Sequence, residues 1–442
     1  MRPLNTITRK KLLQAGAAAG MASVLPIPIQ AAARTDSSYR GKITVYGIAV
    51  PSPGHPGVIK LFQDFEKAHP GISIENHGFP SDRFVALFTA AQASGEQIDL
   101  LWLNGQDLRR YALAGDLVPL NGLPHLERFW PIGRKTYTIN GKLWALPSGS
   151  IGGFPIFYNK ALLDKYHLPV PETYAQLLTV GKELTKQGVS AYTHDGKNIY
   201  LWPVWFFTTY AQVTANRSVE KTIATLTGHG KFTDPEVVEA LDVIFGLARH
   251  KIFSPDVLSL DTDGATAEFM TGKAAFWLHY DGVIATVRQA APPNLNPPGM
   301  DLAVTLFPWV DKKTIKPQFP GGTGAAAGIY SKTSAARRKV AVEILEFMTT
   351  DQADAYLVKD GNSTTGTNMH AKGSTDAVAL KEKTLLPNMT IYLDWYWPPE
   401  ITRAFQEGIQ AGVGLKKTAP QVARDIQAVF TKVVKSGYKF AH

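Results

Sequence analysis

The chain has 442 residues, a formal net charge of +9 and no cysteine. The lack of cysteine excludes disulfides, thiolate metal sites, cysteine nucleophiles and lipid attachment through a cysteine. The 46 basic residues are scattered rather than clustered, which argues against a nucleic-acid partner. A chain of this length is expected to hold two or more domains. Its nine tryptophans indicate flat apolar surfaces of the kind that binding sites use.

Residues 1–33 are predicted to be a secretory signal peptide rather than part of the fold. A basic start is followed by an apolar, alanine-rich segment over 12–29, and small residues at 30–33 offer a cleavage site. A membrane-spanning helix would need about 20 strongly apolar residues, and the prolines and alanines of this segment argue against one. Residues 8–13 resemble a twin-arginine signal, except that Lys10 replaces the second arginine, so the export route stays open.

The first part of the remaining chain alternates strand and helix patterns. Apolar runs at 42–47 and 98–103 and an alternating segment at 72–75 predict strands. The run at 98–103 has the character of a strand that is buried on both faces. Apolar residues at helical spacing predict two helices between these strands, one with Val58, Leu61, Phe62 and Phe65, the other with Phe84, Leu87, Phe88 and Ala91. This alternation favours a mainly parallel α/β arrangement.

Local signals further along the chain predict individual turns and helix ends. Asn140-Gly141, between alternating apolar residues, predicts a β-hairpin. Thr173 and Gln176 fit a capping box that begins a helix. Pro235 suits the first turn of a long helix. A further amphipathic helix is predicted from the spacing of Val340, Ile344, Phe347 and Met348.

One stretch of the sequence carries a family resemblance. The hairpin strand at 142–147 leads into 151–164, which reads Ile-Gly-Gly-Phe-Pro-Ile-Phe-Tyr-Asn-Lys-Ala-Leu-Leu-Asp, and then into 169–178. This order of strand, irregular Gly/Pro segment, short strand and helix resembles the extracellular solute-binding proteins of ABC importers, in the group that includes maltose-binding protein. Other segments resemble motifs of that family and follow its order, namely 99–120, 267–276, 319–328, 339–350 and 397–401.

The resemblance implies an α/β, two-lobed periplasmic-binding-protein fold, similar to type II, with a ligand cleft between discontinuous lobes. The N-lobe would comprise 41–145 and 306–362, and the C-lobe 146–304 and 366–442. Ligand would enter the cleft, and closure of the lobes would bury it. The resemblance also implies a periplasmic monomer that is exported with a cleaved signal peptide and needs no cofactor. Its partners would be a small molecule and the membrane subunits of an ABC permease.

Polar residues near the ends of two predicted strands are the first candidates for ligand contact, because ligands of open α/β sheets sit at the carboxyl ends of strands. Asn104, Gln106 and Asp107 follow the strand at 98–103, and planar polar side chains suit the hydroxyls of a sugar. Asp107 has the alternative role of a helix cap. Ser150 lies in a glycine-rich segment after the next predicted strand, for which the alternative is a tight turn or hinge.

Two further candidate groups follow later strands. His279, Tyr280 and Asp281 come directly after the apolar run at 274–278. The family often has Gly-x-Trp here, so the stacking residue at this position stays open. Gly322 belongs to a glycine-rich segment in which the backbone is able to approach a ligand closely. A metal site is not expected, because no His-x-x-x-His or His-x-His spacing occurs.

Aromatic clusters supply the stacking candidates. Trp202 and Trp205 lie in an aromatic run at 200–207, for which a core helix is the alternative. Trp395 and Trp397 flank a tyrosine just before two prolines, and three consecutive aromatic side chains cannot all face one core. Trp395 or Trp397 is therefore expected to contact ligand, and the resemblance implies a sugar-stacking position in this region.

The leading interpretation is a periplasmic receptor, not an enzyme, that captures a mono- or oligosaccharide and delivers it to an ABC permease. A receptor for another polar solute, such as a glycerol-phosphate, is an alternative of the same class. The rival class is an exported carbohydrate-active enzyme, which needs two carboxylates across its cleft. Asp99, Asp107, Asp281 and Asp394 are available for that role, although no Gly-x-Ser-x-Gly nucleophile motif occurs.

Overall fold

The computed structural model describes residues 39–47, 56–79, 81–290, 296–310, 316–360, 365–371, 373–438 and 440. The predicted signal peptide at 1–33 lies outside the described residues, as does the side chain of Gln106. Within these ranges, no helix has both the length and the apolar character that a membrane crossing requires.

One sheet has the strand order β12-β11-β3-β1-β2, with β6 paired to β11 off that path. Its strands are β1 (Gly41–Gly47), β2 (Ile72–Gly78), β3 (Leu100–Leu103), β6 (Leu146–Gly153), β11 (Phe319–Ile329) and β12 (Met389–Ile391). β1 runs parallel to β2 and β3, whereas β11 runs antiparallel to β3 and β6. The accompanying helices are α2 (Pro56–Ala68), α3 (Ser81–Ser94), α4 (Gly105–Ala114), α5 (Pro131–Thr136), α13 (Ala335–Phe347) and α14 (Asp351–Asp360).

A second sheet has the strand order β10-β7-β9-β8. Its strands are β7 (Ile156–Asn159), β8 (Ser190–Thr193), β9 (Ala274–Leu278) and β10 (Leu302–Thr305). β8 and β9 are parallel, so their carboxyl ends lie at the same edge of the sheet. The accompanying helices are α6 (Lys160–Lys165), α7 (Tyr174–Lys186), α8 (Trp202–Val213), α9 (Ser218–Leu226), α10 (Pro235–Arg249), α11 (Thr262–Met270), α12 (Gly282–Gln289), α15 (Ala377–Lys383), α16 (Pro399–Val413) and α17 (Ala419–Lys435).

Several shorter elements connect these parts. A small hairpin pairs β4 (Thr138–Ile139) with β5 (Lys142–Leu143). Single turns of 3₁₀ helix are η1 (Leu126–Arg128), η2 (Ile199–Leu201), η3 (Leu386–Asn388) and η4 (Leu393–Tyr396). The last of these, η4, carries the predicted stacking residue Trp395.

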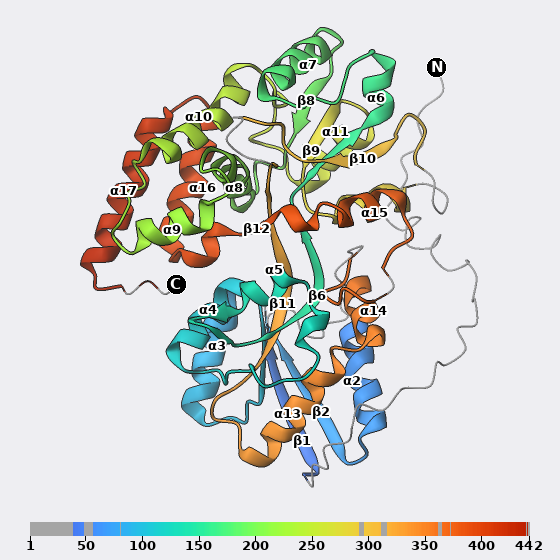
Figure 1. The fold of residues 1–442 in the computed structure, drawn as a ribbon, viewed down its shortest axis with the longest axis vertical. Coiled ribbons are helices and arrows are strands. Elements are labelled where there is room, and N and C mark those ends of the chain that lie inside the picture. Colours follow the sequence, from blue (N-terminus) through green and yellow to red (C-terminus); the bar gives the residue numbers. More distant parts are fainter. Residues whose placement is uncertain are drawn as a thin grey trace, which may run out of the picture. The chain divides into compact units, whose positions relative to one another are not determined.

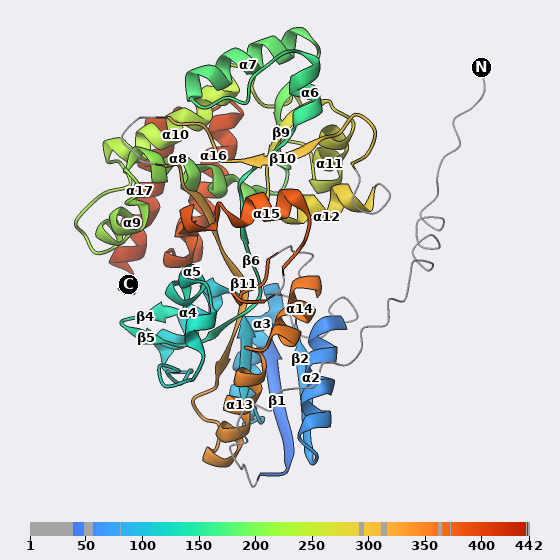
Figure 2. The same cartoon turned by 45° about the vertical axis from the view of Figure 1, so that its right-hand side comes forward.

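The strands β6 and β11 link the two sheets. They pair in antiparallel register, with Gly153 opposite Gly321, and the chain enters β7 of the second sheet directly after β6. In Figures 1 and 2 the two strands lie side by side. Glycine is required at this close approach, because a Cβ added to Gly153 would overlap the carbonyl oxygen of Pro320.

The local sequence signals are confirmed with one exception. Asn140 and Gly141 take positive φ angles of 52° and 73° in the hairpin, as a tight hairpin turn with Asn-Gly requires. Thr173 forms the predicted capping box of α7, and α10 begins at Pro235. The exception is Leu87, predicted to face the core of α3, which is 40% exposed.

Each sheet has its own hydrophobic core. One cluster of buried residues surrounds β1 and β3 and includes Ile344 of α13. A larger cluster lies against β7, β8 and β9 and includes buried residues of α8, α10, α16 and α17. A third, smaller cluster contains Ile151 of β6 and Phe319 of β11. The residue boundaries proposed above for the two lobes stay predictions.

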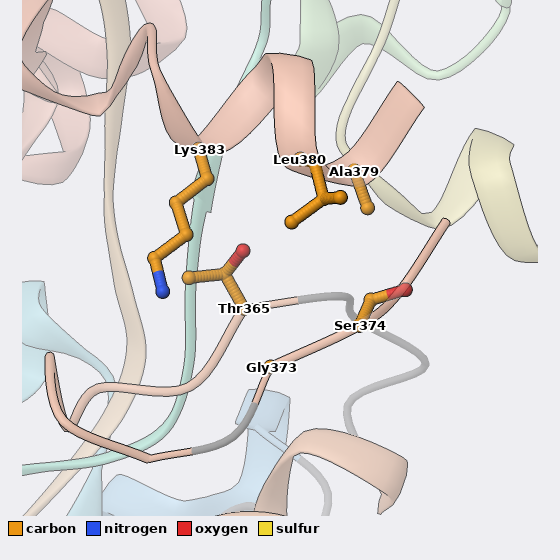
Figure 3. A pocket seen from close by; sticks show the side chains of 6 residues that line it. All are labelled: Thr365, Gly373, Ser374, Ala379, Leu380 and Lys383. Atoms are coloured by element: carbon orange, nitrogen blue, oxygen red, sulfur yellow. The ribbon is translucent and has the colours of Figure 1, made fainter. Parts of the chain in front are cut away.

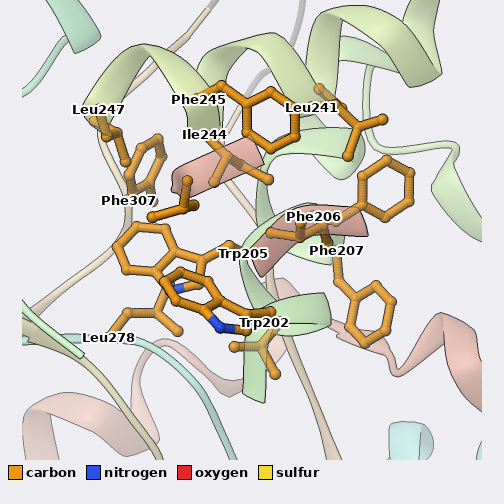
Figure 4. Packing of buried hydrophobic residues seen from close by; sticks show 14 of the residues in the cluster. Trp202, Trp205, Phe206, Phe207, Leu241, Ile244, Phe245, Leu247, Leu278 and Phe307 are labelled. Atoms are coloured by element: carbon orange, nitrogen blue, oxygen red, sulfur yellow. The ribbon is translucent and has the colours of Figure 1, made fainter. Parts of the chain in front are cut away.

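Trp202 and Trp205 belong to the larger core, which corrects the prediction that one of them contacts ligand. Both side chains are fully buried, and Figure 4 shows Trp205 packed near Phe307. Nε1 of Trp202 donates a hydrogen bond of 2.9 Å to the carbonyl of Gly196. All twelve residues of α8 are buried, so the aromatic run forms part of a core helix that is covered on every side.

A fragment of residues 41–145 alone is expected not to fold. β3 pairs with β11, and the first core includes residues of β11, α13 and α14, all of which the fragment lacks. Thermal unfolding followed by circular dichroism should therefore show no cooperative transition for this fragment. A cooperative melt would contradict the interdependence of these segments.

Trp397→Ala is expected to cost about 3–5 kcal/mol of stability, because it opens a cavity in the core. The Trp397 side chain is buried and stacks on Phe405, with ring centroids 4.2 Å apart. This burial corrects the prediction that Trp397 contacts ligand. Urea unfolding measures the loss, and Tyr438→Ala, at a half-exposed aromatic residue, is the control expected to change stability by about 0.5 kcal/mol or less. Equal stabilities of both variants would contradict the core assignment.

Candidate functional site

A continuous arc of aromatic rings lies where the connecting strands meet both sheets. Trp395 of η4 stacks near Tyr137, with ring centroids 6.5 Å apart, and contacts Tyr392 at 5.0 Å. Tyr392 in turn lies 6.1 Å from Phe154, and Phe154 lies 6.4 Å from Tyr280. The arc therefore joins four parts of the chain. Tyr137 precedes the hairpin, Tyr392 and Trp395 lie before and within η4, Phe154 links β6 to β7, and Tyr280 follows β9.

Two glycines make room for Trp395. A Cβ added to Gly105, the first residue of α4, would lie 2.5 Å from Cζ3 of the indole. A Cβ added to Gly322 of β11 would lie 3.1 Å from Cη2 of the same ring. The six-membered ring of the indole therefore rests against backbone, and the side chain as a whole is only partly buried.

The residues around Trp395 hold it in place. Leu393 and Trp397, two positions away on either side, are both buried in the larger core. Tyr396 covers the guanidinium of Arg109 on α4, with the central carbon 4.5 Å from the ring centroid. Because η4 is anchored on one side in the core and on the other against α4, the indole has little freedom to move.

The structure assigns the cap of α4 to Asn104 rather than to Asp107. The Asn104 side chain accepts a hydrogen bond of 2.9 Å from the backbone N–H of Asp107. Asp107 lies in the first turn of the helix, and burial raises the pKa of its carboxyl, against the opposing charge of Arg110. Asn104 and Asp107 therefore lie at the N-terminus of α4, together with Gly105, which contacts Trp395.

The predicted residues at the end of β9 lie at the other end of the aromatic arc. His279 and Asp281 are buried, whereas Tyr280 is 41% exposed. Nε2 of His279 is 3.4 Å from Oδ2 of Asp195, which follows β8. A Cβ added to Gly152 of β6 would lie 2.8 Å from Oδ1 of Asp281. Asp281 therefore adjoins the strand that links the sheets.

Ser150 lies on the same linking strand, β6, and is partly buried. It forms an isolated antiparallel bridge with Gly366, and the neighbouring Ile151 N–H donates to the carbonyl of Thr365. The segment around Gly366 is thus held against β6. This pairing is compatible with the hinge that the sequence offered as an alternative role for Ser150.

A small hollow adjoins the segment that pairs with β6. It is lined by Thr365, Gly373, Ser374, Ala379, Leu380 and Lys383, between α15 and the segment before it (Figure 3). None of the predicted site residues lines it. Among the described residues, no group of three or more His, Asp or Glu side chains is arranged to hold a metal ion.

The sequence interpretation missed four residues of this region, namely Tyr137, Phe154, Tyr392 and Asp195. Asp195 follows β8 at the carboxyl end, so the rule that selected Asn104 and His279 would also have selected it. Tyr137 and Phe154 carry no such signal, because their ring neighbours in the arc are distant in sequence, whereas Tyr392 lies only three residues before its neighbour Trp395.

Residues 60–388 match the family described as bacterial extracellular solute-binding protein. The chain belongs to this family. An uncharacterized ABC transporter extracellular-binding protein of Pyrococcus horikoshii is 23% identical to this solute-binding protein over 181 residues, 40% of this chain and only 43% of that relative. The multiple sugar-binding protein of Streptococcus mutans is 20% identical over 351 residues, 77% of this chain and 79% of that one.

Solved structures of other proteins are similar to this chain over most of its length. A family 1 extracellular solute-binding protein from Bifidobacterium longum subsp. infantis has a TM-score of 0.75 at 16% identity, covering 89% of this chain and 99% of that one. A chitin oligosaccharide binding protein has a TM-score of 0.72 at 18% identity, covering 90% and 100%. These likenesses confirm the predicted two-lobed α/β fold of solute-binding proteins.

The stability that Asp394 contributes to this solute-binding protein is expected to be lost as the pH rises from about 4 to about 7. Burial raises the pKa of Asp394, next to Trp395, to about 7, against about 3.9 in an unfolded chain. A raised folded-state pKa stabilises the fold below the unfolded value, and that contribution is lost as pH rises through the folded value. Burial also raises the pKa of Asp354, to about 6, so it adds to the same slope.

Urea unfolding between pH 4 and pH 8 tests this expectation. The difference in stability between wild type and Asp394→Asn should change steadily in the direction of the variant as the pH rises from about 4 to about 7, and should level off above it. A variant profile parallel to that of the wild type across the whole range would show that Asp394 does not titrate there.

Proposed function

We propose that this protein captures a carbohydrate, a mono- or oligosaccharide, on the partly exposed surface of Trp395 and delivers it to the membrane subunits of an ABC permease. The observation that carries the proposal is the aromatic arc from Tyr137 through Trp395 to Tyr280. The names of a Streptococcus mutans relative and of one similar solved structure, a sugar-binding and a chitin oligosaccharide binding protein, support a carbohydrate.

The chemistry of the arc suits a sugar. Aromatic rings offer flat apolar surfaces for the C–H faces of a pyranose, while a few fixed polar groups orient the ligand. Asn104 and Asp107 at the start of α4, Ser150 on β6, and His279 and Asp281 after β9 are the polar groups proposed to bind hydroxyls. Gly105 and Gly322 leave room for the indole ring of Trp395. We propose that the backbone of Gly322 contacts the ligand.

The arrangement also supports delivery rather than catalysis. Asp99, one of the four carboxylates available to an enzyme, is fully buried and pairs with Nε of Arg337 at 2.8 Å. It also accepts hydrogen bonds from the backbone N–H of Thr44 and the side chain of Gln97, so its role is structural. We propose that ligand binding and release follow closure and opening about β6 and β11.

Arg109 favours a neutral sugar over a glycerol-phosphate. A phosphate calls for a cation presented to the ligand, whereas the guanidinium of Arg109 beside the arc is buried beneath Tyr396. As a member of a solute-binding family, the protein is proposed to act as a monomer in the periplasm after cleavage of its signal peptide.

Trp395→Ala is expected to weaken carbohydrate binding by about 1–2 kcal/mol, roughly 5- to 30-fold in Kd, because it removes the stacking surface. Calorimetric titration with glucose, galactose, N-acetylglucosamine, maltotriose, raffinose and chitotriose first identifies a ligand of the wild type. Trp309→Ala is the matched control, because this partly buried tryptophan pairs with Thr173 outside the aromatic arc, and it is expected to keep ligand affinity.

Two results would reject the proposal. Wild-type affinity of Trp395→Ala for the identified sugar would remove Trp395 from the site. Release of shorter sugars from the oligosaccharides by the purified wild type would identify an enzyme rather than a receptor.

A further inference from the structure

We infer that Asp195 is a positioning residue that fixes, through His279, the ring of Tyr280 as a second aromatic surface of the ligand site. This surface lies at the far end of the arc from Trp395, so a ligand that touches both has more than one sugar ring. The inference rests on the proposed function for the nature of the ligand and deepens it toward oligosaccharides.

Asp195 joins three elements around one buried carboxylate. It follows β8 and is fully buried. Its Oδ2 accepts a hydrogen bond of 2.8 Å from the hydroxyl of Thr262, the first residue of α11. The same oxygen lies 3.4 Å from Nε2 of His279 at the end of β9. One carboxylate oxygen thus sets the distance between β8, α11 and the imidazole.

The charge of Asp195 is retained despite its burial. Burial alone would raise the pKa of the carboxyl, but the hydrogen bond from His279 and the nearby imidazoles hold the pKa below its usual range. Burial lowers the pKa of the adjacent His194 to about 4, so this ring is neutral near pH 7. The two groups nearest Oδ2 of Asp195, the Thr262 hydroxyl and Nε2 of His279, belong to two other elements, so the carboxylate fixes the position of both.

His279 connects Asp195 to Tyr280 through a ring contact. The His279 ring is clamped between Trp277, with centroids 4.2 Å apart, and Tyr280, at 4.7 Å. Tyr280 also lies 6.4 Å from Phe154, and a Cβ added to Gly282 would overlap its ring. Neighbours therefore hold the Tyr280 ring while 41% of the residue stays exposed.

Tyr200 is a second exposed tyrosine close to Asp195 in the chain. It lies in η2 and is 61% exposed. The loops after β8 and β9 thus each carry an exposed tyrosine.

A double-mutant cycle tests the inference. Calorimetry measures the affinity of whichever of maltotriose, raffinose and chitotriose binds the wild type best, for Asp195→Asn, Tyr280→Ala and the double variant. Each single change should weaken binding about 5- to 10-fold, and the double variant should bind as weakly as Tyr280→Ala alone. Asp261→Asn is the matched control, because this exposed carboxylate caps α11 next to Thr262, and it should keep wild-type affinity.

A purely structural role of Asp195 would give a different pattern. The two losses would then multiply in the double variant, and the component monosaccharide would be bound more weakly as well; either result overturns the inference. If Asp195→Asn does not fold, Thr262→Val replaces it in the cycle with the same expected outcomes, because it removes the hydrogen bond that holds the Asp195 carboxylate.

A measurement without ligand separates this inference from the proposed function. The ¹⁹F resonance of Tyr280 in 3-fluorotyrosine-labelled protein, assigned with Tyr280→Phe, should shift or broaden in Asp195→Asn and not in Asp261→Asn. An unchanged resonance overturns the positioning role. If the wild type binds none of the sugars, the proposal of a carbohydrate ligand is rejected, and with it the inference of an oligosaccharide. The ¹⁹F resonance still decides whether Asp195 positions Tyr280.

Discussion

The antiparallel pairing of β6 with β11 is the constraint on which the rest of the structure depends. It attaches the chain that leads into the second sheet to a strand of the first. Its glycines are needed because the neighbouring groups leave no room for a Cβ: the Pro320 carbonyl approaches Gly153, and Asp281 approaches Gly152. The connection between the sheets is therefore narrow, and groups from both sheets meet around it.

The position of Trp395 is set by the way its neighbours in and after η4 pack. Leu393 and Trp397 enter the larger core, so the residues between them are turned toward α4. There the indole rests on Gly105 and the neighbouring Tyr396 covers Arg109. A side chain fixed in this way loses little conformational entropy when a ligand stacks on it, which favours affinity through preorganisation.

The sequence predicted the local structure and the fold family better than the site. The Asn140-Gly141 hairpin and the capping box at Thr173 depend on neighbours within a few residues, and both are present. The choice among tryptophans depends on partners distant in the chain. Trp205 is covered by Phe253 and Phe307, and Trp397 by Phe405 of α16, and no local pattern distinguishes them from Trp395. Asp195 obeys the strand-end rule and was predictable, whereas its link to Tyr280 through His279 required the pairing of β8 with β9.

A crystal structure of the protein with its best-binding trisaccharide tests the central claim most directly. The account predicts one sugar ring stacked on the exposed surface of Trp395, within van der Waals distance of the indole, and hydroxyls hydrogen-bonded to residues at the start of α4 or the end of β9. A sugar bound elsewhere, with Trp395 out of contact, would contradict it.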